Sequence, residues 1–297
     1  MEKLGFLGLG MMGAPMTRNL LKAGFPVTVF DVDWARMQSL AGLGAKPAAS
    51  PAEVARQSDI ILACLPSAEI VEQTLAGKDG VLQGCRSGQV FIDHTTNFPA
   101  ASEKAAGMLS AKGVEMLDAP VSGGNMGAEQ GTLSIMAGGK PEVFDRCLPV
   151  MSAMGKRVVL MGHKVGAGGY AKLVNQIMVS IHLASAAEAF VFAKKAGLDM
   201  KKLVSVLEAG WANSTVLNVK APKILANDYS PAGTCTIMQK DLSYIARAAE
   251  NMGVPIPFSR RVLDMYETLI AQGKGGVDQM ALVHLLAAEA GVDMGQG

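Results

Sequence analysis

The stretch GFLGLGMMGAPM, residues 5–16, carries three glycines in the order G-x-G-x-x-G, directly after an apolar run and before a candidate helix. Each glycine has a physical use in a strand-turn-helix unit. Gly8 allows a tight turn, Gly10 lets the backbone approach a pyrophosphate, and Gly13 permits close packing of helix on strand. The stretch therefore predicts the opening unit of a dinucleotide-binding α/β fold. The alternative is a glycine turn that binds nothing.

An acidic residue after the next candidate strand adds context to this turn. Asp31 lies 18 positions after Gly13, where a carboxylate accepts hydrogen bonds from a ribose diol. The same carboxylate repels the 2′-phosphate of NADP, so NAD is favoured. NADP remains possible because Arg36 softens that repulsion. The cofactor contacts expected in this unit are Gly8, Leu9, Gly10, Met11, Met12, Gly13 and Asp31.

Length and composition bound the class of protein. With 297 residues, the chain is long enough for two domains of roughly 150 residues each. Its formal net charge of +1 gives no electrostatic reason to expect nucleic acid or an anionic membrane, so a small molecule is the expected partner. The four cysteines form no C-x-x-C pair, which predicts a reduced, cytoplasmic setting and no metal site. His182 and Glu188 interrupt the most apolar stretch, 177–193, so no membrane segment is expected.

The organisation changes near the middle of the chain. Short Val, Ile and Leu runs alternate with helical stretches up to about residue 163, which is typical of a doubly wound, mostly parallel sheet. After the glycine cluster GHKVGAGG the pattern is helical, beginning with a long helix that reaches about Lys195. We therefore predict an α/β domain over 1–163 and an all-helical domain over 164–297. The candidate strands are 4–7, 27–30, 60–65, 90–93, 115–117, 133–137 and 158–161, and Pro51, Pro99 and Pro141 mark helix starts.

Two loops follow strand ends in the first domain. Loops at the carboxyl ends of parallel strands line the ligand crevice of such sheets. In CLPS, residues 64–67, we expect Leu65 and Pro66 to contact the cofactor. In DHTTN, residues 93–97, Thr96 is the expected contact, with local turn chemistry an equal alternative for the threonine pair. His94 is a lone histidine in this loop, and such a residue is more often structural than a catalytic base, so a structural role is expected.

The loop DAPVSGG, residues 118–124, offers a hydroxyl and exposed amides. Ser122 followed by Gly123 and Gly124 forms the kind of concavity that binds carboxylates. The alternative is a plain turn.

The helix start YAKLVNQI, residues 170–177, places polar side chains on one stripe. Lys172, Asn175 and Gln176 stand at i, i+3 and i+4, and lysine and asparagine are seldom buried without partners. One interpretation is a solvent-facing helix start. The functional interpretation is that this face closes the nicotinamide cleft, with Lys172 exchanging a proton with a carbonyl and alcohol pair. Asn175, with Gln176 behind it, then orients the substrate and the lysine.

Together, GFLGLGMMGAPM, DAPVSGG, GAGGYAKLVNQ and QKDL resemble the β-hydroxyacid dehydrogenase family over nearly the whole chain. The resemblance implies an N-terminal Rossmann domain and an all-helical C-terminal domain joined by a long helix. It also implies reversible NAD(P)-dependent oxidation of a 3-hydroxy acid. On this chain the family's catalytic residues fall on Lys172 and Asn175, and its second cleft lysine, near nicotinamide and substrate, falls on Lys240. Its substrate-carboxylate loop falls on Ser122, Gly123 and Gly124.

Within the family, the motifs are most similar to those of tartronate semialdehyde reductases, which form D-glycerate. The alternatives are a 3-hydroxyisobutyrate dehydrogenase, where a second asparagine more often replaces Gln176, and another semialdehyde reductase such as one for succinic semialdehyde. Three departures lie in the helical domain that shapes the pocket. Gly233 replaces a bulky aromatic, Met238 and Gln239 precede Lys240, and DQMAL, residues 278–282, lacks the usual serine.

Other interpretations of the chain predict different chemistry. An imine reductase shares the architecture but usually replaces the catalytic lysine, and 6-phosphogluconate dehydrogenase needs a much longer helical domain. A catalytically silent dinucleotide-sensing module is the non-enzyme alternative, against which an intact Lys172 and Asn175 weigh. The apolar helical stretch SIHLASAAEAFVFAKKAG, residues 180–197, predicts burial between subunits and hence a homodimer or homotetramer.

Overall fold

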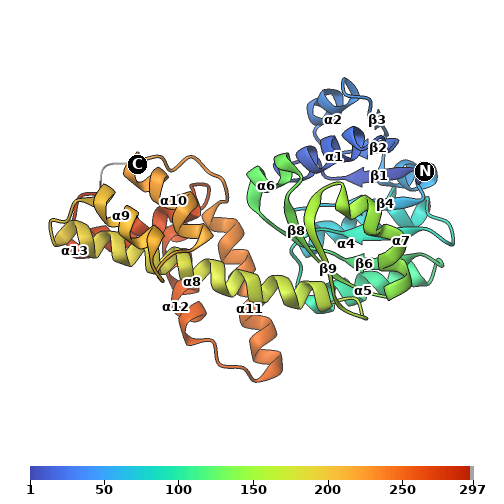
Figure 1. The fold of residues 1–297 in the computed structure, drawn as a ribbon. Helices are drawn as coiled ribbons and strands as arrows, with labels where there is room; N and C mark the ends of the chain where they lie inside the picture. Colours follow the sequence, from blue (N-terminus) through green and yellow to red (C-terminus); the bar gives the residue numbers. More distant parts are fainter. Residues whose placement is uncertain (295–297) are drawn as a thin grey trace. The chain divides into compact units, whose positions relative to one another are not determined.

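The computed structural model of the chain describes residues 1–294, and these form two compact units (Figure 1). The Rossmann unit comprises Met1–Leu173, and the helical unit comprises the described residues from Val174 onward. The units divide inside the long helix α8 (Ala167–Lys195), whereas the sequence places the boundary in the glycine cluster before it. The first turns of α8 stay with the Rossmann unit because Asp118 binds their backbone, as described below.

The Rossmann unit contains one sheet of nine strands in the order β3-β2-β1-β4-β5-β6-β8-β7, with β9 pairing with β8. Every pairing from β3 to β6 is parallel, and β8 runs antiparallel to β6 and β7. The predicted doubly wound sheet is therefore confirmed, with two short strands, β3 and β7, that the apolar pattern did not reveal. The strands are β1 (Leu4–Leu7), β2 (Val27–Phe30), β3 (Lys46–Pro47), β4 (Ile60–Ala63), β5 (Val90–Asp93), β6 (Glu115–Asp118), β7 (Val121–Ser122), β8 (Leu133–Gly138) and β9 (Gly155–Gly162).

Both faces of the sheet are covered by helices, because successive strand residues point to opposite sides. Phe6 and Ile60 belong to one core cluster, and their chain neighbours Leu7 and Ile61 belong to the other. The first cluster contains side chains from α1 (Gly13–Lys22), α2 (Trp34–Ala41), α6 (Gly124–Gln130) and α7 (Pro141–Ser152). The second contains side chains from α3 (Pro51–Gln57), α4 (Ala68–Ala76), η1 (Val81–Gln83) and α5 (Pro99–Ser110). Helices α3, α5 and α7 begin at the prolines that predicted them.

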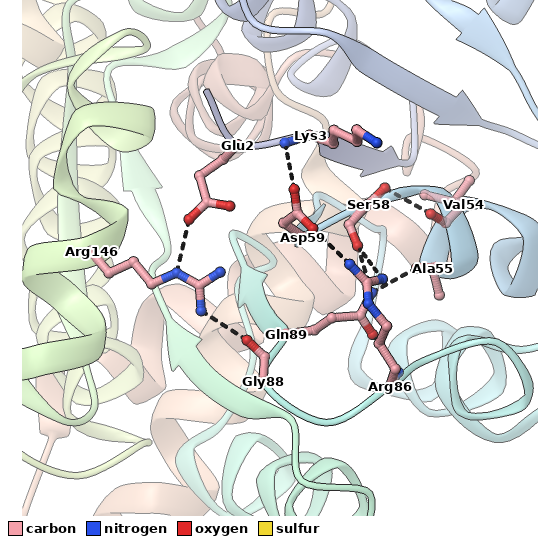
Figure 2. Close-up of polar contacts among 10 residues, drawn as sticks. All are labelled: Glu2, Lys3, Val54, Ala55, Ser58, Asp59, Arg86, Gly88, Gln89 and Arg146. Carbon is pink, nitrogen blue, oxygen red and sulfur yellow. Dashed lines mark hydrogen bonds and ion pairs between the residues drawn. The ribbon is translucent and has the colours of Figure 1, made fainter.

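The amino ends of the central strands are closed by the protein's own polar groups (Figure 2). The Arg86 guanidinium donates to the Ser58 carbonyl at 2.8 Å and to the Asp59 carboxylate at 2.6 Å. The buried Gln89 amide donates to the carbonyls of Ala55 and Ser58 at 2.7 and 2.6 Å. These bonds satisfy backbone carbonyls at the end of α3 and in the turn before β4. They leave the opposite, carboxyl edge of the sheet for a ligand.

The helical unit contains no strand among its described residues, in agreement with the sequence. Besides most of α8 it comprises α9 (Met200–Ala209), α10 (Thr215–Leu225), α11 (Cys235–Met252), α12 (Pro257–Ala271), η2 (Gln279–Ala281) and α13 (Leu282–Ala290). Asp199, Ser214 and Thr234 cap helix starts by accepting backbone hydrogen bonds. A buried ion pair, with Lys220 Nζ 2.7 Å from Asp278 Oδ1, joins α10 to the segment before η2.

By length and apolar composition, α8 is the one helix within residues 1–294 that is able to cross a bilayer. Interior helices of soluble proteins meet the same criterion, and 44% of its most apolar window is buried in the fold. Its polar side chains Lys172, Asn175 and Gln176 all make hydrogen bonds inside the protein. These contacts fit a helix that packs within a folded chain.

Candidate active site

The glycine turn has the geometry that a dinucleotide needs. Gly8 has a φ of +89°, and a Cβ on Gly13 would overlap the Gly8 carbonyl oxygen, so the turn and the start of α1 require glycine at both places. At Gly10 the nearest atom to an added Cβ is Arg36 Nη1, at 3.8 Å. The open backbone at Gly10, beside the N-terminus of α1, leaves room for a pyrophosphate and fits NAD or NADP.

Asp31 is bonded directly to this turn. One carboxylate oxygen accepts a hydrogen bond from the Leu9 amide at 2.6 Å, and the other accepts from the Asp33 amide at 2.8 Å. The Arg36 guanidinium lies 3.7 Å from the first oxygen and also pairs with Asp33 at 3.2 Å. The acid at the end of β2 thus fixes the turn and remains beside the place where a ribose would lie.

A pocket of about 300 Å³ opens between α1 and α2 next to this acid. It contains two side chains that the sequence pattern did not single out, Arg18 on α1 and Ser39 on α2. Arg18 follows Ala14 by one helical turn, and Ser39 follows Arg36 by three residues, so each helix presents a pair on one face. The lining residues are Leu9, Ala14, Arg18, Ala35, Arg36, Ser39 and Leu40.

The loops after β4 and β5 are held together by a threonine. Thr95 Oγ1 accepts a hydrogen bond from the Leu65 amide at 3.0 Å and is buried. Thr96 is partly exposed beside it, and Pro66 continues the first loop. Thr95 therefore holds the two loops together through its side-chain hydrogen bond. Thr96, Leu65 and Pro66 remain predicted cofactor contacts at the carboxyl edge of the sheet.

His94 directly follows β5 and is buried. Its Nδ1 lies 2.7 Å from the Ala119 carbonyl oxygen, which makes Nδ1 the protonated nitrogen. Burial lowers the pKa of His94 to about 4, although the hydrogen bond to Ala119 opposes that shift. A neutral imidazole bonded to the backbone fits the structural role expected from the sequence.

The pKa of His94 predicts a pH-dependent loss of stability. Between its ordinary value of 6.5 and about 4, the unfolded chain binds a proton that the folded chain does not. The free energy of unfolding should therefore fall by about 3 kcal/mol as the pH falls through this window, and no further below it. His94→Asn, whose amide can still donate to Ala119, should lack this loss. Urea unfolding of both proteins from pH 8 to pH 4 measures it.

The wild type and His94→Asn must both be measured at each pH, because Asp118 changes the free energy of unfolding with pH in the opposite direction. Burial raises the pKa of Asp118 from 3.8 to about 7, so its protonation stabilises the folded chain as the pH falls through that range. The difference between wild type and His94→Asn removes this background. A difference that stays constant from pH 8 to pH 4 would contradict the assignment for His94.

Asp118 joins the two glycine-rich motifs of the chain. Its carboxylate accepts hydrogen bonds from the amides of Gly166 at 2.8 Å and Gly169 at 2.6 Å, at the first turn of α8. An added Cβ on Gly168 would overlap the Asp118 carbonyl oxygen, so the helix approaches β6 closely only because it starts with glycines. The loop DAPVSGG and the start of α8 are therefore one structural unit.

Lys172 reaches the predicted carboxylate loop from that unit. Lys172 is 7% exposed, and its Nζ donates to the Val121 carbonyl at 2.8 Å. Val121 pairs with β8 in the two-residue strand β7 and is followed by Ser122. Gly123 and Gly124 come next, with φ values of +134° and +62°, and both are exposed. The structure thus brings the predicted proton donor beside the predicted anion loop, inside the Rossmann unit.

Asn175 and Gln176 begin a chain of polar contacts in the helical unit. Asn175 Nδ2 donates to Gln176 Oε1 at 2.8 Å, and Gln176 Nε2 donates to Asp241 Oδ2 at 2.6 Å. The other Asp241 oxygen lies 3.3 Å from Lys240 Nζ, which also lies 5.4 Å from the centre of the Tyr244 ring. Gln176 and Asp241 are both buried. The predicted residues Asn175 and Lys240 are thus connected through two side chains whose pairing no sequence pattern predicted.

The comparisons with protein families cover both units. Residues 3–162 match the family model described as the NAD-binding domain of 6-phosphogluconate dehydrogenase. Residues 166–286 match the model described as the NAD-binding of NADP-dependent 3-hydroxyisobutyrate dehydrogenase. The Rossmann unit is therefore an NAD(P)-binding domain.

Individual relatives match over almost their whole length. The chain is 36% identical to 2-(hydroxymethyl)glutarate dehydrogenase of Eubacterium barkeri, covering 99% of this chain and 98% of that one. It is 34% identical to 2-hydroxy-3-oxopropionate reductase of Escherichia coli, covering 96% and 97%. A crystal structure of 3-hydroxyisobutyrate dehydrogenase from Salmonella typhimurium superimposes with a TM-score of 0.89 at 31% identity, covering 95% and 99%. The chain therefore belongs to the β-hydroxyacid dehydrogenase family, that of 3-hydroxyisobutyrate dehydrogenase, and is an NAD(P)-dependent 3-hydroxyacid dehydrogenase.

Proposed function

We propose that this dehydrogenase interconverts D-glycerate and tartronate semialdehyde, with Lys172 as its proton donor and acceptor. The observation that supports this assignment is the position of Lys172 Nζ, 2.8 Å from the carbonyl of Val121 and hence beside Ser122. A short 3-hydroxy acid has its carboxylate two carbons from the reacting alcohol. One loop and one adjacent lysine are enough to hold both ends of such a substrate.

Each residue of the proposed site has one task. Ser122 and the amides of Gly123 and Gly124 bind the substrate carboxylate. Lys172 takes the proton from the hydroxyl during oxidation and returns it during reduction, with its side chain held by Val121. Asn175, three residues along the same helix, orients the lysine and the substrate. The family resemblance assigns Lys240 the role of adding positive charge near nicotinamide and substrate. Bound NAD(P) supplies or accepts the hydride.

NAD is the proposed physiological cofactor, and NADP is a possible second one. Asp31 is 8% exposed and keeps its carboxylate beside the glycine turn, where it would repel a 2′-phosphate. Arg36 is half-exposed and already paired with Asp31 and Asp33, so only part of its charge is left to offset that repulsion.

A second candidate substrate is 2-(hydroxymethyl)glutarate, a 3-hydroxy acid with a second carboxylate. Gly233 stands where relatives usually carry a bulky aromatic, and the side-chain amide of Gln279 lies 3.4–3.5 Å from the place of an added Cβ there. The backbone N–H of Gln279 also donates to the Gly233 carbonyl at 2.9 Å. The Gln279 amide thus lies where relatives have an aromatic ring, and an amide can bind a second polar group of the substrate. This arrangement favours a longer substrate that carries such a group.

A substrate panel tests the proposal. Tartronate, methylmalonate and succinic semialdehydes are reduced with NADH and with NADPH, and D-glycerate and 2-(hydroxymethyl)glutarate are oxidised with NAD and NADP. We expect the highest kcat/KM for tartronate semialdehyde with NADH. A higher value for 2-(hydroxymethyl)glutarate would favour the second candidate, and a higher value with NADPH would overturn the cofactor preference. A flat response from folded protein would support the dinucleotide-sensing module.

We also propose that the enzyme acts in the cytoplasm as a homodimer or homotetramer. Three large apolar side chains of α8 are exposed in the single chain, Val174 at 62%, Met178 at 54% and Phe192 at 75%. Apolar side chains of this size on one helix favour burial against another subunit. Light scattering at micromolar concentration should report a dimer or tetramer, and a monomer would contradict the proposal.

A further inference from the structure

Two buried residues of the helical unit have no role in the proposed chemistry, although they connect residues that do. Gln176 on α8 and Asp241 on α11 are 7% and 2% exposed, and they are joined by a hydrogen bond of 2.6 Å. Buried polar groups are costly unless they are paired, so a contact between side chains 65 residues apart calls for an explanation.

The charge of Asp241 determines the orientation of both amides. An ionised carboxylate only accepts hydrogen bonds, so Gln176 must turn Nε2 toward Asp241 Oδ2. Gln176 Oε1 then faces Asn175, and only Asn175 Nδ2 can donate to it, as observed at 2.8 Å. The hydrogen bond to Asp241 thus fixes which end of the Gln176 amide is N and which is O, and the bond to Gln176 does the same for the Asn175 amide. The carboxylate therefore determines the donor and the acceptor in both hydrogen bonds.

We propose that Asp241 and Gln176 are positioning residues that hold Asn175 with its Oδ1 turned to the reacting groups. This inference rests on the proposed function, in which Asn175 orients Lys172. Asn175 Nδ2 is used in the hydrogen bond to Gln176, so Oδ1 is the side-chain atom of Asn175 that can accept one. Lys172 stands three residues earlier on the same face of α8 and donates to the Val121 carbonyl. A second N–H of Lys172, donated to Asn175 Oδ1, directs the lone pair of the neutral amine toward the substrate hydroxyl.

The same carboxylate also restrains the second lysine. Asp241 Oδ1 lies 3.3 Å from Lys240 Nζ, while Oδ2 is bonded to Gln176. One buried acid therefore forms an ion pair with Lys240 through Oδ1, although Oδ1 makes no hydrogen bond, and holds the Gln176 amide beside Asn175 through Oδ2. Loss of its charge should disturb the reaction step more than cofactor binding.

The test exchanges the acid and the amide between the two positions. In Asp241→Asn the amide chain can flip, so kcat should fall about 10- to 100-fold. The KM for the cofactor should stay close to that of the wild type, and the pH at which kcat is half-maximal should shift. In the double variant Gln176→Glu with Asp241→Asn, the carboxylate introduced on α8 accepts from both neighbours and Asn175 keeps its orientation. This variant should regain most of the lost kcat and the wild-type pH profile.

Ser243→Ala is the matched control, because it removes a side-chain hydrogen bond to Gln239 on the same helix and should leave kcat unchanged.

Thermal unfolding tests the coupling of Gln176 and Asp241 without any substrate. The single variants Gln176→Glu and Asp241→Asn should each lower Tm, and the double variant should restore it. A folded Asp241→Asn variant with the kcat and pH profile of the wild type would overturn the positioning role. A double variant no more active than Asp241→Asn alone would also overturn it. If the wild-type enzyme oxidised no acid of the panel, the proposed function would fail, and the thermal cycle would still report whether the two side chains are coupled.

Discussion

Replacement of Lys172 by methionine is expected to lower kcat by about 10²- to 10⁴-fold, the usual contribution of a positioned proton donor. Methionine keeps the apolar stem that is buried beside β7 and removes the ammonium group. The Val121 carbonyl then loses its donor, which costs about 1–3 kcal/mol of stability. NADH should bind normally. Steady-state kinetics with tartronate semialdehyde and fluorescence titration with NADH measure the two effects separately.

Two further variants separate chemistry from structure at this position. Lys172→Arg restores a donor for Val121 but cannot give up its proton, so it should recover stability without recovering kcat. Lys194→Met changes an exposed lysine near the end of the same helix and should leave activity intact. A Lys172→Met enzyme that kept more than about a tenth of wild-type kcat would rule out the assignment, since even the smallest expected loss is larger.

The parts of the fold that could be predicted from the sequence are those that depend on local patterns. The strands at 4–7, 27–30 and 90–93 are buried apolar runs, and the structure has them within the same bounds. Glycines with positive φ or with no space for a Cβ define the turn at Gly8–Gly13 in the same local way. Proline at the first helical turn determined the starts of α3, α5 and α7.

The parts that could not be predicted depend on polar contacts between distant positions. Asp118 bonds Gly166 and Gly169, 48 and 51 residues away, and so anchors the helix that carries Lys172. Gln176 reaches Asp241 across 65 residues. Hydrophobic periodicity does not predict such a pairing, because it reports only the local secondary structure around each residue. A single polar contact between distant residues leaves the residue pattern on either side of it unchanged. The strands β3 and β7 were not predicted either, because two residues are too few to show the alternation of apolar and polar side chains that indicates a strand.

Gly13→Ala is expected to abolish dinucleotide binding together with local structure. An added Cβ would overlap the Gly8 carbonyl oxygen and also lie 3.0 Å from the Phe6 ring, so the turn and α1 must move apart. Overpacking of this kind typically costs about 1–3 kcal/mol. Thermal unfolding should therefore show a lower Tm, and NADH titration should show no saturable binding. Wild-type values in both measurements would contradict the packing role of this glycine.

Gly10→Ala should give the complementary result, a folded protein that binds the dinucleotide poorly. The nearest atom to its Cβ is the flexible end of Arg36 at 3.8 Å, so Tm should stay within the range of the wild type. The methyl group would occupy the space through which the pyrophosphate approaches the backbone, and the Kd for NADH should rise about 100-fold, or about 2.8 kcal/mol. The matched control is Gly107→Ala in the exposed face of α5, where nothing lies within 4 Å of an added Cβ. That variant should gain up to about 1 kcal/mol from helix propensity and bind NADH as the wild type does. If Gly10→Ala bound NADH equally well, the pyrophosphate would have to lie elsewhere, and Gly10 would be a turn residue like Gly8.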